Sequence, residues 1–168
     1  MISFPAPIGG LNFRDPIASM PPIDAIEMEN WLPVTSSVRV RKGAVDWATG
    51  ISGAVEALLP YNTTAGTGKL FAATDTSIYD VTSSGAVGAP VQSISNGAMN
   101  STVFTTAGGT YLVCTNGVDN LRLFNGTAWS TITDVSTPIS ITGLPTSSLL
   151  LARPFKQRLW FVQQASMS

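Results

Sequence analysis

The side chains in this sequence that could perform acid–base chemistry are a few scattered carboxylates. The chain contains no histidine, so the commonest general base, the usual zinc ligand and every Ser/His or Cys/His nucleophile pair are absent. Glu27 and Glu29 are two residues apart and would point to different sides of a helix. Asp75, Asp80 and Asp119 stand beside expected strands and turns, where aspartate usually stabilises the turn itself. The sequence therefore predicts no catalytic carboxylate pair, and we expect a protein that is not an enzyme.

Two loops carry part of a ligand-binding motif. TAGTGK at 64–69 has the Gly–Lys pair of a phosphate-binding loop, but neither Ser or Thr nor a helical pattern follows the lysine. VDNLRLFNG at 118–126 has oxygen-bearing side chains without the regular spacing and terminal Glu of a calcium loop. We therefore predict no cofactor and no metal ion, with a loosely held calcium ion at the second loop as the alternative.

The composition indicates a β-rich protein whose surface is partly covered by other chains. Hydrophobic residues make up 44% of the 168 residues, whereas 11% are charged, which is less than half of the usual share. The formal net charge of -1 gives no overall attraction to nucleic acid or to anionic membranes. The first residues do not form a signal peptide, and the longest apolar run, LLLA at 149–152, is too short to span a bilayer. We expect a soluble protein, made in a cytoplasm, with no membrane anchor.

The single cysteine, Cys114, lies in the apolar run YLVCT. One cysteine excludes a disulfide framework inside the chain, and its apolar neighbours predict a buried, unreactive thiol.

The first 54 residues differ from the rest of the chain and are predicted to form an assembly region. Five prolines within residues 1–22 exclude a continuous helix or an interior strand. They predict an extended arm that docks on a neighbour, with a mobile terminus as the alternative. Asp24 and Glu27 have the spacing of a helix N-cap and its N3 partner, so a helix of about two turns is expected before Pro33. The following SSVRVRKG alternates valine with arginine, as in a half-buried strand.

Residues 55–168 contain a repeat of apolar strands separated by polar turns. The paired runs are LLPYN and KLFAAT, then TVFTT and TYLVCT, then LLLARPF and RLWFVQ. In the first two units a third and a fourth strand follow: SIYDVT and APVQSI, then LRLFNG and AWSTIT. This pattern predicts a mostly β fold with a partial β-propeller-like repeat of four-stranded blades. A β-sandwich with similar hairpins is the alternative. About two and a half blades are present, too few to close a ring. We expect the sequence or the product to be truncated, with missing strands supplied from elsewhere as the alternative.

The basic residues Arg39, Arg41 and Lys42 are candidates for contacts with a partner. Alternation places the two arginines on one face, which suits an acidic surface of a neighbouring subunit or the phosphates of DNA. Glu27, Glu29 and Asp46 in the same segment could neutralise these cations, and no aromatic residue is interleaved for base stacking. We favour a subunit contact, with a solvated face and DNA contact as alternatives.

The four tryptophans divide into two pairs. Trp129 and Trp160 fall on repeated strands and are expected in the cores of the blades. Trp31 and Trp47 flank the basic strand, where they could equally anchor an interface or lie in a core. An exposed tryptophan could instead stack on a sugar. The residues that we predict at a subunit interface are Arg14, Asp15, Asn30, Trp31, Arg39, Arg41, Lys42 and Trp47.

The stretch GGLNFRDPIASMPPIDAIEMENWLPVTSSVRVRKG resembles the N-terminal region of tail tube or tail-nozzle proteins of short-tailed double-stranded DNA bacteriophages. Those proteins open with a Gly-rich arm, a Pro-containing segment, a short helix that ends in Asn–Trp or Asn–aromatic, and a strand that closes in Arg-x-Gly or Arg-Lys-Gly. RPFKQRLWFV and the repeats are also similar to that family. The matching positions are Gly9, Gly10, Pro21, Pro22, Asn30, Trp31, Pro33, Arg41 and Gly43.

The resemblance implies a structural virion protein of a phage tail, namely a nozzle, tail tube or head-to-tail connector component. It implies a homo-oligomeric ring, six-fold in those phages, below the portal and adaptor, with an axial channel that guides the genome during ejection and contacts DNA transiently. Family members are several times longer than this chain. A carbohydrate- or receptor-binding β module, such as part of a tail fibre or a lectin-like propeller, is the alternative. A propeller glycosidase ranks third because it needs a converging pair of carboxylates.

Overall fold

The chain divides into two compact units, Met1–Val45 and Asp46–Ser168, each of which is described by itself. The structure is a computed structural model that describes residues 5–63, 66 and 68–164. Within these residues all regular structure is β-strand apart from two short 3-10 helices, η1 (Ile17–Ser19) and η2 (Thr146–Ser148). The predicted mostly β fold is confirmed.

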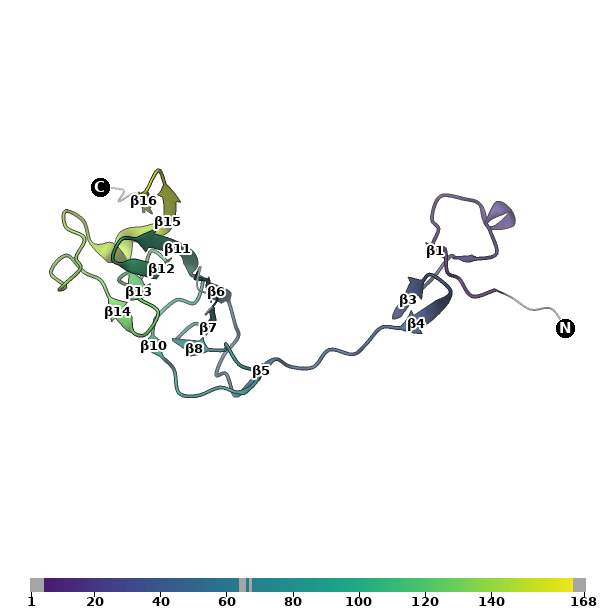
Figure 1. Ribbon diagram of the computed structural model, residues 1–168, viewed down its shortest axis with the longest axis horizontal. Coiled ribbons are helices and arrows are strands. Elements are labelled where there is room, and N and C mark those ends of the chain that lie inside the picture. The colour runs from purple at the N-terminus through teal and green to yellow at the C-terminus, as the bar shows by residue number, and fades with distance from the viewer. Residues whose placement is uncertain (1–4, 64–65, 67, 165–168) are drawn as a thin grey trace. The chain divides into compact units, whose positions relative to one another are not determined.

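The first unit contains two small two-stranded sheets (Figure 1). β1 (Gly10–Leu11) pairs in parallel with β2 (Asp24–Ala25), so the Pro-rich segment folds back on itself through η1 instead of running as one extended arm. β3 (Trp31–Val34) and β4 (Ser37–Val40) form an antiparallel hairpin. The strand predicted from SSVRVRKG is therefore confirmed.

The helix predicted to begin at Asp24 is wrong. The carboxylate of Asp24 accepts a hydrogen bond from Asn12 Nδ2 at 2.7 Å, and its backbone pairs with Gly10 in β2. Asn30 has a left-handed backbone (φ 58°) that turns the chain into β3. A two-turn helix is marginal without tertiary support, and here strand pairing with a distant segment takes its place.

The second unit is built around two four-stranded antiparallel sheets, ordered β10-β8-β7-β6 and β11-β12-β13-β14 (Figure 1). The first sheet contains β6 (Ala57–Tyr61), β7 (Lys69–Ala73), β8 (Ser77–Asp80) and β10 (Gln92–Ser93). The second contains β11 (Asn100–Thr106), β12 (Gly109–Thr115), β13 (Arg122–Phe124) and β14 (Trp129–Thr131). These positions confirm the strands predicted for the first two repeats.

A third repeat forms an antiparallel hairpin of β15 (Leu149–Phe155) and β16 (Arg158–Gln163). A short parallel pair, β5 (Ala48–Thr49) with β9 (Gly85–Ala86), lies at the start of this unit. None of the sheets closes on itself, and the described residues form no closed ring of sheets.

Successive side chains of β12 point into two different cores. Leu112 and Cys114 belong to the cluster that joins the two four-stranded sheets, whereas Val113 belongs to the cluster shared with the β15–β16 hairpin. A strand that is buried on both faces carries a continuous apolar run instead of a polar alternation, which explains YLVC in this segment. The three repeats therefore pack face to face in chain order.

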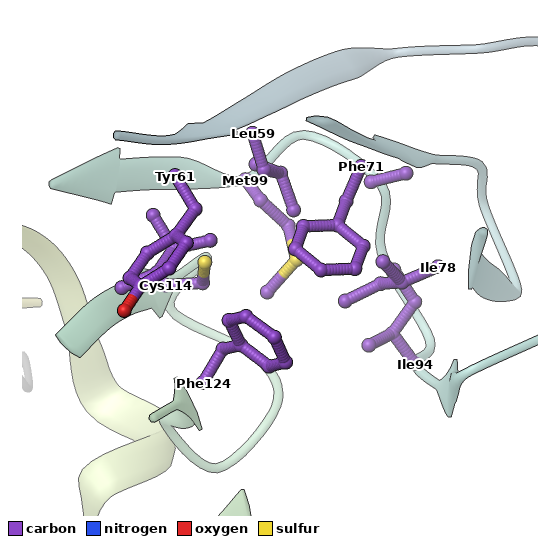
Figure 2. Close-up of a cluster of buried hydrophobic side chains, with 10 residues drawn as sticks. Leu59, Tyr61, Phe71, Ile78, Ile94, Met99, Cys114 and Phe124 are labelled. Atoms are coloured by element: carbon purple, nitrogen blue, oxygen red, sulfur yellow. The ribbon is translucent and has the colours of Figure 1, made fainter. Parts of the chain in front are cut away.

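Phe124 occupies the centre of the first cluster. Its ring centroid lies 5.2 Å from that of Tyr61, 5.0 Å from Phe71 and 5.3 Å from Trp129. Figure 2 shows Tyr61, Phe71 and Phe124 converging around Met99. The predicted core position of Trp129 is confirmed by its packing against this cluster.

The predicted core position of Trp160 is wrong, because this side chain is 56% exposed. Leu159 and Phe161, its neighbours in β16, pack against the second cluster. Since side chains alternate along a strand, Trp160 points to the opposite, uncovered face.

Candidate interaction surface

The first unit buries almost no apolar surface of its own. None of its described hydrophobic residues is buried. Phe13 is 83% and Ile17 75% exposed. A unit of this size has little buried apolar surface to stabilise it, and this one has almost none. We call its exposed large side chains the N-terminal apolar surface: Leu11, Phe13, Ile17, Ile23, Ile26, Trp31, Leu32, Val40 and Val45.

Asn12 organises the loop that carries the predicted residues Arg14 and Asp15. Its Nδ2 donates to Asp15 Oδ2 at 3.0 Å and to Asp24 Oδ2 at 2.7 Å. Its Oδ1 accepts from the backbone N–H groups of Arg14 and Asp15, both at 3.1 Å. The hydrogen bond from Asn12, followed by that from Arg14, lowers the pKa of Asp15. The sequence analysis did not single out Asn12. An asparagine whose side-chain oxygen accepts hydrogen bonds from the backbone N–H groups two and three residues later is nevertheless a known turn pattern.

Gly9 is needed where the chain passes Asp24. A Cβ atom on Gly9 would lie 2.0 Å from Asp24 Oδ1, and the Gly9 N–H donates to the carbonyl of Ile23 at 2.8 Å. The Gly-rich start of the segment thus allows the close approach that precedes the β1–β2 pair.

The β3–β4 hairpin has one apolar face and one mixed face. Trp31 lies opposite Val40, and Pro33 lies opposite Val38, so all four side chains share a face. Arg39 lies opposite Leu32 on the other face. Trp31 is 47% and Val40 62% exposed, which leaves much of the apolar face uncovered.

A hollow of about 500 Å³ opens beside this apolar face. Its acidic part comes from Glu27 and Glu29, and its apolar part from Trp31, Val38 and Met28, with Pro7 at its edge. This lining suits an apolar side chain or one that ends in a positive charge.

The basic side chains Arg39, Arg41 and Lys42 are exposed, and no salt bridge in the described part of the chain includes them. The backbone N–H of Arg41 donates to the carbonyl of the predicted residue Asn30 at 2.7 Å. These three cations are therefore free to meet acidic groups of a partner.

Trp47, the last predicted interface residue, belongs to the second unit. Its Nε1 donates to the carbonyl of Val81 at 2.9 Å, and its own carbonyl accepts from the N–H of Gly85 at the same distance. The ring remains 57% exposed. Trp47 thus fixes the β5 segment to the first four-stranded sheet, and seven of the eight predicted residues share the first unit.

Two of the carboxylates considered for chemistry, Asp80 and Asp119, are held in local hydrogen bonds. Burial raises the pKa of Asp119, but hydrogen bonds from Ser95 and Asn116 outweigh it and leave this pKa below the ordinary value. Asp80 accepts from Lys69 Nζ at 2.7 Å, and its pKa is likewise lowered although burial opposes the change. Across the described ranges, no three His, Cys, Asp or Glu side chains gather as a metal site would require.

Two further predictions concern residues of the second unit. Cys114 is buried, and burial raises the pKa of its thiol far above the usual range. In TAGTGK, residues 64, 65 and 67 lie outside the described residues, while Lys69 begins β7.

No helix in the described part of the chain is long and apolar enough to span a membrane.

A second concave surface lies in the second unit, between the second sheet and β16. This β16 groove has a volume of about 310 Å³ and carries no charged side chain. Sequence reasoning missed it because Ile139 and Ile141 reach it from a loop far from β16 in the sequence. Its lining residues are Phe104, Thr106, Tyr111, Val113, Leu121, Leu123, Ile132, Ile139, Ile141, Leu159 and Phe161.

Comparison with known proteins gives no relative: no protein-family model, curated protein or solved structure matches this chain.

Proposed function

We propose that this chain is a structural subunit of a bacteriophage tail, a nozzle, tube or connector component that assembles into a homo-oligomeric ring around the genome-ejection channel. The observation that carries the proposal is the N-terminal apolar surface. It exposes nine large hydrophobic side chains on a unit that buries none. Exposed apolar patches of this kind are typical of interfaces between proteins.

The arrangement of the second unit supports a propeller-like role for its repeats. Two four-stranded sheets with the same strand order pack face to face, and a hairpin stacks on the second. The first strands of successive repeats, β6, β11 and β15, contact one another in series. First strands of propeller blades likewise converge toward the axis of the ring.

In this proposal the ring lies in the virion tail below the portal and adaptor, with the six-fold symmetry that the family resemblance implies. The first unit is the part that grips a neighbouring subunit. Arg39, Arg41 and Lys42 supply positive charge for an acidic partner surface. Transient contact of the same cations with the genome is a secondary part of the proposal.

One observation favours a second candidate, a carbohydrate- or receptor-binding β module. Trp160 and Phe155 of the β15–β16 hairpin are 56% and 60% exposed. Exposed aromatic rings can stack on sugars through their apolar faces. This candidate does not need a ring.

Native mass spectrometry with negative-stain class averages of the full chain tests the proposal. We expect a closed ring for the wild type and its loss in Val40→Glu, because a carboxylate buried in an apolar interface is strongly unfavourable. Val135→Glu is the matched control, since Val135 is 81% exposed on a loop of the second unit. A monomer at every concentration that binds glycans would refute the ring and favour the second candidate.

A further inference from the structure

The unpaired positive charge of this chain is concentrated at one strand, β4. Of the nine lysine and arginine residues, five have a side-chain interaction within their own unit: Arg14 with Asp15, Lys69 with Asp80, Arg122 with Thr131 and Ser93, Arg153 with Ala152, and Lys156 with Phe155. The other four side chains, which find no partner among the described residues, are Arg39, Arg41, Lys42 and Arg158. Three of these four lie in β4 or directly after it.

The same unit contains two carboxylates that share one hollow. We call it the acidic hollow, and its lining residues are Pro7, Glu27, Met28, Glu29, Trp31 and Val38. Neither Glu27 nor Glu29 has a salt bridge or a side-chain hydrogen bond within the described part of the chain. Two carboxylates at one hollow repel each other, and a cation between them removes the repulsion. The volume of about 500 Å³ is in the range of pockets that hold a whole small ligand, so a long basic side chain can enter it.

The arginines of the hairpin point away from the acidic hollow beside it. Trp31 and Val38 share one face of the β3–β4 hairpin and line the hollow. Arg39 lies opposite Leu32 on the other face, because successive side chains of a strand point to opposite faces. Arg41 is the next residue in this alternation, and its N–H still extends the hydrogen bonding of the hairpin. The basic face and the acidic hollow of one hairpin therefore meet only when two copies of the chain come together.

We propose that the acidic hollow of one copy receives Arg39 of a second copy, with Arg41 beside it. The inference rests on the proposed function, because it names the contact through which the N-terminal unit grips its neighbour. A contact between two different surfaces of the same chain is head-to-tail, and it closes into a ring if the rotation between subunits allows it. Each copy then uses its hollow for one neighbour and its arginines for the other.

The charges of the two surfaces match in number and in spacing. Glu27 and Glu29 are separated by one residue, as are Arg39 and Arg41. Side chains two residues apart on a strand start about 7 Å from each other, so each guanidinium group can face one carboxylate. Arg158, the remaining unpaired cation, is single and offers one charge to a hollow that contains two.

Trp31 makes the acidic hollow suited to a guanidinium group. Its ring is 47% exposed and lines the hollow next to the two carboxylates. A guanidinium group is planar, so it stacks on an indole ring and donates two parallel hydrogen bonds to a carboxylate. The alkyl part of the arginine covers the apolar lining at Val38 and Met28. The carboxylates repel a phosphate group, which excludes nucleic acid as the occupant of this hollow.

The contact buries apolar side chains together with the ion pairs. Leu32 lies opposite Arg39 on the basic face and is 52% exposed, so insertion of Arg39 brings Leu32 against the rim of the hollow. An ion pair at an open surface contributes little to association. A pair enclosed by Leu32 of one copy and Trp31 of the other is less accessible to water and salt, and its attraction is screened less.

Charge reversal in two separate full-length proteins tests this contact. The acid-reversed variant carries Glu27→Lys and Glu29→Lys, and the base-reversed variant carries Arg39→Glu and Arg41→Glu. Native mass spectrometry should show loss of the ring for each variant alone, because like charges then meet at every contact. An equimolar mixture should restore rings in which the two variants alternate in equal numbers, since every contact in them joins opposite charges. Arg158→Glu, at an exposed strand position of the second unit, is the matched control and should keep the wild-type ring.

The outcomes separate this inference from the proposed function. A wild-type ring that persists in either variant alone, or that is lost and not restored by mixing, would overturn the inference and leave the proposed function standing. A monomeric wild type would overturn both. A ring restored only when all four substitutions are in one chain would show that the arginines bind their own hollow, and a mixed dimer that grows no further would show a two-fold contact. Both results contradict the proposal.

Discussion

The close approach of Gly97 to the backbone of Thr74 gives a sharp test of how the first two repeats pack. A Cβ atom on Gly97 would lie 2.5 Å from both the carbonyl carbon and the carbonyl oxygen of Thr74, and 2.8 Å from Glu56 Oε2. The Glu56 side chain can move, but the Thr74 backbone is held by the Thr74–Ser77 turn that leads into β8. Gly97→Ala therefore forces a backbone displacement next to the buried Met99.

We expect Gly97→Ala to lower the free energy of unfolding by about 1–3 kcal/mol, the usual range for overpacking a filled site. Gly88→Ala is the matched control, since a Cβ atom at Gly88 meets nothing within 4 Å and Gly88 is exposed. Neither glycine has a positive φ that would strain an alanine. Both substitutions reduce the entropy of the unfolded chain equally, so the difference between them measures the collision with Thr74.

Urea denaturation of the full chain, followed by near-ultraviolet circular dichroism, provides the measurement. With a denaturant slope of about 1–3 kcal/mol per molar urea, a loss of about 2 kcal/mol moves the midpoint by about 1 M. The control should keep the wild-type midpoint or exceed it slightly. Equal midpoints for the two alanine variants would refute the packing of Gly97 against Thr74.

Three further predictions concern the second unit. Phe124→Ala should lower the free energy of unfolding by about 3–5 kcal/mol, whereas Phe155→Ala, at an exposed position, should change it by less than about 1 kcal/mol; similar urea midpoints would contradict the core assignment. The pKa of Asp119 lies below its ordinary value of 3.8 in the folded protein, so its carboxylate stabilises the fold above that value and loses the effect as the pH falls through the folded pKa. Thermal unfolding at decreasing pH should therefore cost the wild type more than Asp119→Asn, and parallel pH profiles would contradict this. A thiol reagent should label Cys114 only in urea, because burial keeps the thiol protonated and inaccessible; rapid labelling of the native protein would count against its burial.

The strands of the repeats could be predicted from the sequence because their signals are local. YLVCT and KLFAAT are apolar runs of strand length between polar turns, and a strand buried on both faces needs such a run. Trp160 was misassigned because the same run does not tell which face is covered. In β16 the next sheet that would cover Trp160 and Val162 is absent from the described residues, and both side chains are exposed.

The helix at Asp24 and the β16 groove show where local reasoning fails. The Asp24 and Glu27 spacing is a genuine helix signal, but the carboxylate that would cap the helix is hydrogen-bonded to Asn12. The groove depends on Ile139 approaching Phe161 across the fold. Contacts of this kind between segments far apart in sequence leave no pattern that a single sequence can show.

The N-terminal apolar surface gives assembly a physical reason. The first unit exposes nine large hydrophobic side chains, and none of its described hydrophobic residues is buried. Exposed apolar patches of this kind are typical of interfaces between proteins. In the proposed ring a neighbouring subunit would cover these side chains and supply the burial that the unit does not provide for itself.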